Sequence, residues 1–126
     1  MDGDAESWFA TWVELARRVC DQAERSEAHG RQVTARDAYL RAAGYYATAL
    51  VSIDATADPQ RLGPVFGKHR HCFDRFAAGW DPPAEQVFIP YEGGSLPGYL
   101  FSPPGIAGAL PIVIVNNGSD GPINAV

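Results

Sequence analysis

A polar, glycine-rich loop near the end of the sequence has the residue types that can stabilise a developing negative charge. Residues 116–121 are Asn-Asn-Gly-Ser-Asp-Gly, and they directly follow the four β-branched residues 112–115. Glycines on either side of a small serine allow backbone N–H groups to point into one concavity, which an oxyanion requires. Ligands of open α/β sheets bind at the carboxyl ends of strands, so this position favours a functional loop. A polar turn that only ends a strand explains the same spacing equally well.

Two histidines and a cysteine, His69, His71 and Cys72, lie close enough in sequence to suggest a metal site. They fall in a helical pattern, where residues two positions apart point to nearly opposite faces. The sequence has one other histidine, His29, and no second cluster of ligands. We therefore expect no bound metal, and no motif in the chain indicates a cofactor.

Three aromatic residues, Tyr45, Tyr46 and Trp80, are candidates for the wall of a substrate pocket. Aromatic side chains often line small-molecule sites, because they offer large apolar surfaces. At helical spacing the same residue types are more typical of a core, and this interpretation is favoured for Tyr45 and Tyr46. A pocket role and a core role therefore both stay open.

The composition is that of an ordinary globular domain without a nucleic-acid partner. The chain has 126 residues, 46% of them hydrophobic and 20% charged, which allows one compact domain with a modest core. Its formal net charge is -5, and no stripe of Lys and Arg is present to contact a phosphate backbone. Nucleic-acid binding is therefore not expected.

The sequence shows neither an export signal nor a membrane span. Residues 1–4 are acidic and no apolar run follows them, unlike a secretory signal. No apolar run approaches the roughly 20 residues that cross a bilayer. Cys20 and Cys72 lie in helix-like apolar patterns, so we expect two small buried side chains in a reducing compartment and no disulfide. These features predict a cytoplasmic protein with no membrane partner.

Apolar residues recur at helical spacing over three stretches in the first two thirds of the chain. The stretches are residues 8–23, 34–53 and 58–79. They predict a helical N-terminal domain over residues 1–81.

Local signals indicate where these helices begin and end. Asp4 or Ser7 can cap the first helix, and Gly30 supplies the left-handed residue that commonly follows a helix. Residues 34–37 resemble a capping box at the start of the second helix. Asp58 followed by Pro59 predicts the start of the third, since proline is favoured at the first helical position.

The periodicity changes after Pro82-Pro83, because two adjacent prolines cannot continue a helix. Residues 86–90 and 96–101 are short β-type runs, separated by residues 91–95, whose glycines permit a positive φ. They predict an antiparallel hairpin at the start of a second domain, residues 82–126.

A further apolar run, Ile112 to Val115, predicts a strand that is buried on both faces, as in a sheet flanked by helices. A hairpin and one such strand cannot cover their own faces and edges. We therefore expect a fragment that stops at Val126, before further strands and helices of the sheet, or one chain of a larger assembly. A homo-oligomer is an alternative way to cover the strand.

These strand and loop motifs resemble the opening of the catalytic domain of α/β hydrolases. The matching segments are residues 87–93, 96–101 and 111–121. They are similar to helical-capped esterase-like and carbon–carbon-bond hydrolases, a subfamily that includes 2,6-dihydroxypseudooxynicotine hydrolase and fungal pigment polyketide-shortening enzymes. The helices before them resemble the N-terminal cap of that subfamily, so the resemblance covers nearly the whole chain.

The resemblance implies a partial α/β fold and a parent enzyme that hydrolyses a small-molecule ester or ketone, the latter at a carbon–carbon bond beside the carbonyl. In the subfamily, the loop after this strand donates a backbone hydrogen bond to the oxyanion, which corresponds to Gly118, Ser119 and Asp120. The family's nucleophilic serine lies in a later G-x-S-x-G elbow, followed by an aspartate and a histidine. None has a counterpart here, so we expect this chain alone to be inactive. Its implied partner is the rest of the hydrolase domain or a companion chain.

Ser119 itself lies in a pattern, residues 117–121, that imitates a nucleophile elbow. Asn117 stands where the tight turn needs a small residue, and no histidine follows Ser119 to activate it. We therefore expect Ser119 to contribute its backbone and not its hydroxyl group.

A binding module is the alternative to an enzyme segment. An Ala-rich helix pair around Gly30 and Arg41-Ala42 resembles tetratricopeptide helices, which bind peptides in a groove. No second copy appears at the expected period. A non-catalytic truncated protein is the other alternative.

Overall fold

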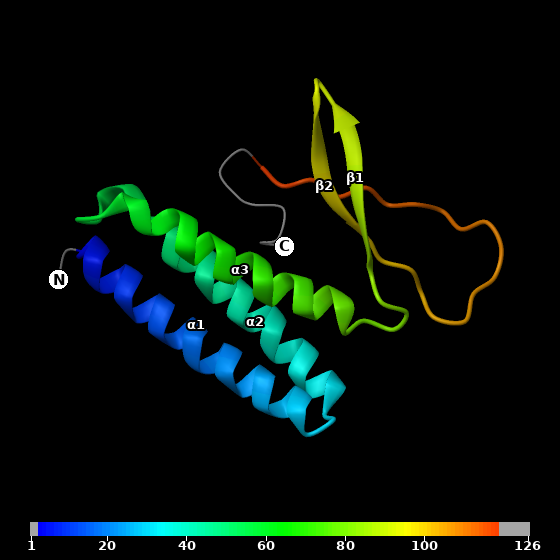
Figure 1. Cartoon of the computed structure of the whole chain (residues 1–126), viewed down its shortest axis with the longest axis horizontal. Coiled ribbons are helices and arrows are strands. Elements are labelled where there is room, and N and C mark those ends of the chain that lie inside the picture. The colour runs from blue at the N-terminus through cyan, green and yellow to red at the C-terminus, as the bar shows by residue number, and fades with distance from the viewer. Residues whose placement is uncertain (1–2, 119–126) are drawn as a thin grey trace.

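The structure, a computed structural model that describes residues 3–118, contains three helices followed by a β-hairpin (Figure 1). The long helices pack side by side, and the hairpin stands at one side of them (Figure 1). The bounds are α1 Ala5–Ala28, α2 Gln32–Leu50, α3 Leu62–Ala78, β1 Glu85–Tyr91 and β2 Gly94–Leu100, with short 3₁₀-helices at Ile53–Ala55 and Pro59–Arg61.

Helix α1 has the predicted cap residue and the predicted glycine after it, and it extends beyond residues 8–23 at both ends. The Asp4 carboxylate accepts hydrogen bonds from the backbone N–H groups of Glu6 and Ser7, at 3.1 and 3.2 Å. At the other end Gly30 has a φ of 73°, the left-handed conformation in which a side chain is disfavoured. The cap at Asp4 and the glycine stop are therefore confirmed.

The starts of α2 and α3 differ from the expected ones. Helix α2 begins at Gln32, and no side chain caps it, so residues 34–37 lie inside the helix and form no capping box. Asp58 does cap, through a 3.1 Å bond from the Gln60 N–H, but it caps the 3₁₀-helix that precedes α3. Gly79 ends α3 as predicted.

Alanines on the helix faces allow the three helices to approach closely. Helix α2 lies between the other two and makes most of their contacts, because α1 and α3 each pack mainly against it. Small side chains leave room for the neighbouring backbone, and the larger residues fill the spaces between them. The buried members of this core are Phe9, Ala16, Ala23, Ala35, Ala38, Tyr39, Ala42, Ala43, Tyr46, Ala49, Ile53, Val65, Cys72 and Phe73.

The hairpin forms in the predicted place. Strand β1 pairs antiparallel with β2, in a register that sets Glu85 opposite Leu100 and Tyr91 opposite Gly94. The two turn residues, Glu92 and Gly93, have φ values of 44° and 81°. Positive φ at both central residues matches the turn to the twist of the flanking strands, which explains the tight connection.

The prediction of a buried strand at Ile112 to Val115 is wrong for this chain. The structure assigns no strand there, and these side chains are exposed, Ile114 to 88%. A strand exists only when a neighbour accepts and donates its backbone hydrogen bonds. Among the described residues β1 and β2 pair only with each other, so the segment has no ladder to join.

The helices end before Asp81 and the strands begin after Pro83, where the sequence predicts a domain boundary. Independent folding of residues 1–81 stays a prediction. None of the helices in the described part of the chain is long and apolar enough to cross a membrane.

Candidate functional site

An apolar cavity of about 730 Å³ lies where the segment after β2 returns toward α3. The segment passes Phe101, turns through a Gly- and Pro-rich stretch and leads to the predicted oxyanion loop. Asn117, within that loop, lines the cavity together with Phe73 of α3 and Tyr99 of β2. The lining residues are Phe73, Tyr99, Leu100, Phe101, Ser102, Pro103, Gly108, Leu110, Pro111, Ile112, Val113, Val115 and Asn117.

The predicted oxyanion loop is described only as far as Gly118. Gly118 is exposed, and a Cβ atom built on it would meet nothing within 4 Å. Ser119 and Asp120 lie outside the described residues. Their role as backbone donors therefore stays a prediction.

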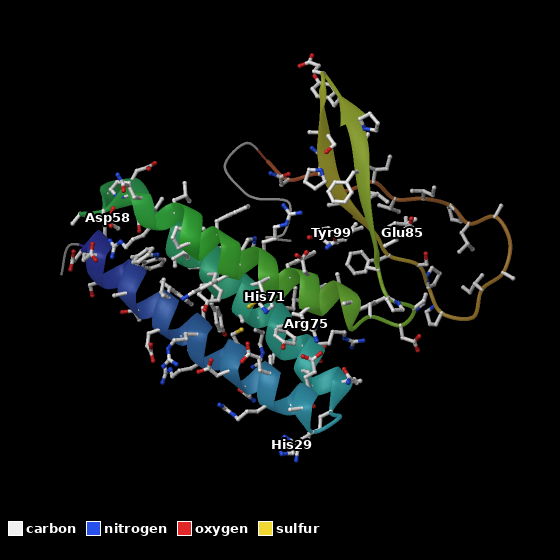
Figure 2. All side chains as sticks on the ribbon, viewed as in Figure 1. His29, Asp58, His71, Arg75, Glu85 and Tyr99 are labelled. Atoms are coloured by element: carbon white, nitrogen blue, oxygen red, sulfur yellow. The ribbon has the colours of Figure 1, made fainter. Side chains whose placement is uncertain are left out.

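Asp74 of α3 anchors the hairpin beside the cavity. Its carboxylate accepts a hydrogen bond from the Tyr99 hydroxyl and a second, at 2.9 Å, from Nε2 of Gln86. The Tyr99 ring also packs edge-on against Phe73, with the ring centroids 4.9 Å apart. Tyr99 thus lies between the hairpin and α3 (Figure 2), and these contacts fix the two parts relative to one another.

The cavity can hold an apolar molecule or chain segment, and the Tyr99 phenol is the one ionisable side chain among its described lining residues. Its lining among the described residues includes no histidine, carboxylate, lysine or arginine. Its polar groups are those of Tyr99, Ser102 and Asn117, beside the backbone. Pockets of this kind bind ligands through apolar area, and a few polar groups orient them. A nucleophile and a base would have to come from other residues.

The three aromatic candidates lie in different places, and none of them lines this cavity. Tyr46 is buried in the helical core, which raises the pKa of its hydroxyl. The Tyr45 ring packs against Trp12, at 5.5 Å between centroids. Trp80 packs against Phe76 and carries the Arg36 guanidinium 4.7 Å from its ring centroid. A substrate-binding role for these residues remains a prediction.

His69 and His71 lie in different surroundings, as their helical spacing predicts. His69 is buried, and its Nδ1–H donates to the Ala43 carbonyl oxygen at 2.8 Å. His71 is exposed at the edge of a second cavity. In residues 3–118 no three or more His, Cys, Asp or Glu side chains come together in a way that could hold a metal ion.

Burial lowers the pKa of His69 below its ordinary value of 6.5, and the bond to Ala43 opposes this only in part. Its Nε2 has no hydrogen-bond partner among the described residues, so a proton there would be buried without an acceptor. The unfolded chain takes up this proton more readily than the folded chain. The free energy of unfolding should therefore fall as the pH drops below about 6.5.

Urea unfolding followed by circular dichroism between pH 8 and pH 5 would measure this slope. In His69→Asn, whose side-chain amide places a donor where Nδ1 stood but does not titrate, the part of the slope due to His69 should disappear. The matched control His71→Asn removes an exposed histidine and should leave the slope unchanged. Equal slopes in the parent chain and His69→Asn would contradict the assignment.

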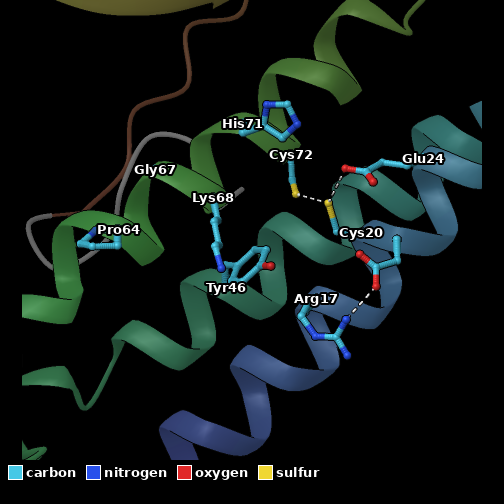
Figure 3. Close-up of a pocket in the computed structure, with 10 residues that line it drawn as sticks. Arg17, Cys20, Glu24, Tyr46, Pro64, Gly67, Lys68, His71 and Cys72 are labelled. Atoms are coloured by element: carbon cyan, nitrogen blue, oxygen red, sulfur yellow. Dashed lines mark hydrogen bonds and ion pairs between the residues drawn. The ribbon is translucent and has the colours of Figure 1, made fainter.

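A second cavity, of about 380 Å³, opens between α1 and α3 (Figure 3). Cys20 and Cys72 meet at its edge, and Tyr46 also lines it. This pairing could not be predicted from the sequence, because no pattern within either helix shows which residue of a distant helix it faces. The only available signal was that both cysteines lie on apolar helix faces.

The comparisons with known proteins place this chain among relatives of the α/β hydrolases. The α/β hydrolase xenA of Xenoacremonium sinensis is 40% identical over 121 residues, and the match covers 93% of this chain. The α/β hydrolase pydG of an Acremonium species is 38% identical, and the 20-hydroxy-prefusarin hydrolase of Gibberella moniliformis is 31% identical, over 93% and 94% of the chain. No family model matches the chain.

The resemblance to α/β hydrolases is thereby confirmed. The matched regions make up 28% of the xenA and pydG proteins and 29% of the Gibberella enzyme. The chain therefore spans less than a third of the length of these relatives.

Proposed function

We propose that this chain forms the helical cap and the oxyanion loop of a serine-type α/β hydrolase. Its substrates would be esters, or ketones cleaved at a carbon–carbon bond beside the carbonyl. The observation that carries the proposal is the match to named hydrolases over more than nine tenths of the chain. The helix pair alone, as in a tetratricopeptide module, does not account for a match that continues through the hairpin.

The proposed contribution of this chain to catalysis is electrostatic stabilisation of the transition state. When a serine attacks a carbonyl carbon, the carbonyl oxygen gains negative charge, and fixed N–H donors stabilise that charge. Backbone N–H groups of Gly118, Ser119 and Asp120 would be such donors. In α/β hydrolases the serine, the aspartate and the histidine follow the oxyanion loop in that order. All three histidines of this sequence precede the hairpin, so these three catalytic residues would come from outside this sequence.

The described geometry supports a substrate site beside the loop. Asn117 immediately precedes Gly118 and lines the apolar cavity, so a molecule held there would lie within reach of the loop. Phe73 and Tyr99 contribute aromatic walls from the helical and the hairpin parts. The cavity would bind the apolar body of a substrate, while its carbonyl oxygen would face the loop.

Several apolar side chains on the hairpin and on the segment after it are exposed, as expected if the hairpin lies at the edge of a larger sheet. Phe88, Ile89 and Tyr91 of β1 are each more than half exposed. Large apolar patches on a protein surface mark sites that another surface covers. We propose that the rest of a hydrolase sheet covers these side chains. Self-association of the chain is the alternative.

The isolated chain should not hydrolyse p-nitrophenyl acetate above the rate of the buffer. Without a catalytic serine and histidine, both the nucleophile and the base are missing. Release of p-nitrophenolate by the purified chain, monitored by absorbance, is the measurement. Activity well above the buffer rate that Ser119→Ala abolishes would overturn the proposal and make Ser119 a nucleophile.

A further inference from the structure

Two cysteine thiols on different helices are in direct contact. The Cys72 thiol of α3 donates to the sulfur of Cys20 on α1, with the two Sγ atoms 3.3 Å apart (Figure 3). The residues are 52 positions apart in sequence, so the fold alone brings them together. Both are free thiols.

The surroundings of the two thiols differ in a way that assigns them different chemical roles. Both cysteines line the cavity between α1 and α3, but Cys72 is fully buried, whereas Cys20 is half-buried. A small polar reagent can therefore reach Cys20 before it reaches Cys72. The cavity is lined by charges of both signs, Arg17 and Lys68 beside Asp21 and Glu24, and Arg17 is ion-paired with Asp21.

The hydrogen bond between the thiols strengthens this difference. The S–H donated by Cys72 stabilises a thiolate on Cys20 and lowers the pKa of Cys20, against the opposing effects of burial and of the carboxylates of Glu24 and Asp21. The same contact, together with burial, raises the pKa of Cys72. Cys20 is thus the better nucleophile, and Cys72 is held in its protonated form beside it.

We propose that Cys20 and Cys72 are a reversible oxidation site at which hydroperoxides convert the contact between α1 and α3 into a disulfide. Cys20 is the thiol that reacts first, and Cys72 is the thiol that completes the bond. A general thiol oxidant of the hydroperoxide class, such as hydrogen peroxide, is the co-reactant.

The reaction has two steps that balance. The Cys20 thiolate attacks one peroxide oxygen and breaks the O–O bond, which gives the sulfenic acid and, with one proton, a water molecule. The Cys72 sulfur then attacks the Cys20 sulfur, a second water leaves and the S–S bond forms. Two thiols lose two protons and two electrons, and the peroxide takes up both and is reduced to two waters.

The fold requires only a small movement for this bond. A disulfide has its sulfurs about 2.05 Å apart, so the pair must close by roughly 1.2 Å from its present separation. Helices α1 and α3 pack mainly against α2, not against each other. The disulfide would therefore tie together two elements that are now connected chiefly through a third.

The direct test treats the full 126-residue chain with hydrogen peroxide and maps the product by mass spectrometry after trypsin digestion without reduction. Cleavage after arginine should release residues 19–25 linked to residues 71–75, with the loss of two hydrogen atoms. Dithiothreitol should separate the two peptides again. A disulfide between two copies of the chain, or oxidation with no link between these peptides, would overturn the proposal.

Matched serine variants distinguish the two roles. In Cys72→Ser the sulfenic acid of Cys20 has no partner, so it should accumulate and form an adduct with dimedone. In Cys20→Ser the buried Cys72 should form at least 10-fold less adduct under the same conditions. Equal adduct formation in both variants, with native circular dichroism spectra, would contradict the assigned order. The peptide map of the unmodified chain gives an answer even if a variant does not fold.

Discussion

Replacing Phe73 by alanine is expected to lower the free energy of unfolding by about 3–5 kcal/mol, the usual range for a buried phenylalanine. Phe73 is 2% exposed and packs edge-on against Phe76 and Tyr99, at 5.4 and 4.9 Å between ring centroids. It belongs to the helical core and also touches the hairpin, so its loss leaves a cavity at the contact between the two. Urea unfolding followed by circular dichroism would measure the change.

The matched control is Phe88→Ala, which removes the same side chain from strand β1. Phe88 is 60% exposed, so its loss should change the free energy of unfolding by no more than about 0.5 kcal/mol. A loss in Phe73→Ala as small as the loss in Phe88→Ala would contradict the buried position described for Phe73.

The helices were predictable because their signals are local. Apolar spacing located all three, and single residues such as Asp4, Gly30 and Gly79 marked ends that the structure confirms. The start of α2 was missed because a capping-box pattern inside a helix looks like one at its beginning. Helix α2 begins at Gln32 without a side-chain cap, so no local signal marks its true start.

The two β-regions had different outcomes for one physical reason. The hairpin contains its own pairing partner, so the turn at Gly93 and the flanking β-type runs were enough to predict it. The segment from Ile112 to Val115 has strong β-type composition but no partner among the described residues. Composition indicates what a segment prefers, while a strand also needs a neighbour.

Contacts between distant elements could not be predicted from the sequence. Nothing in the helical patterns predicts that Asp74 accepts hydrogen bonds from Tyr99 and Gln86 of the hairpin, or that Cys20 meets Cys72. These contacts depend on the rotation of each helix about its axis, which the packing of all three helices sets. For the same reason the three aromatic candidates could not be placed relative to one another.

The second prediction of large effect concerns Gly118, tested where a nucleophile is present. In a hybrid enzyme the matched segment of xenA, 40% identical to this chain, is replaced by this chain. In the complete site, Gly118→Val should distort the loop and turn its N–H groups away from the oxyanion. The turnover number of the hybrid should therefore fall by about 10²-fold or more, the usual loss for one oxyanion donor. The Michaelis constant should change much less, because the donor acts mainly in the transition state. Steady-state kinetics with a p-nitrophenyl ester would separate the two constants.

Two controls accompany this variant. Ser119→Ala keeps the backbone N–H and should leave turnover largely intact. In the isolated chain a Cβ on Gly118 meets nothing within 4 Å, so Gly118→Val should leave its unfolding free energy unchanged within about 0.5 kcal/mol. Full turnover of the Gly118→Val hybrid, or a change in the Michaelis constant alone, would make the loop a structural turn.

The most direct test of the proposed role is the rate at which the unmodified hybrid reacts with a fluorophosphonate, a reagent that traps the nucleophile of a serine hydrolase in a tetrahedral adduct. If this chain supplies a working cap and oxyanion loop, the labelling rate of the hybrid should lie within about tenfold of the rate for unmodified xenA. Loss of one oxyanion donor would instead lower the labelling rate by about 10²-fold. The labelled residue should belong to the xenA part. A folded hybrid that is not labelled, or one labelled within this chain, would contradict the account.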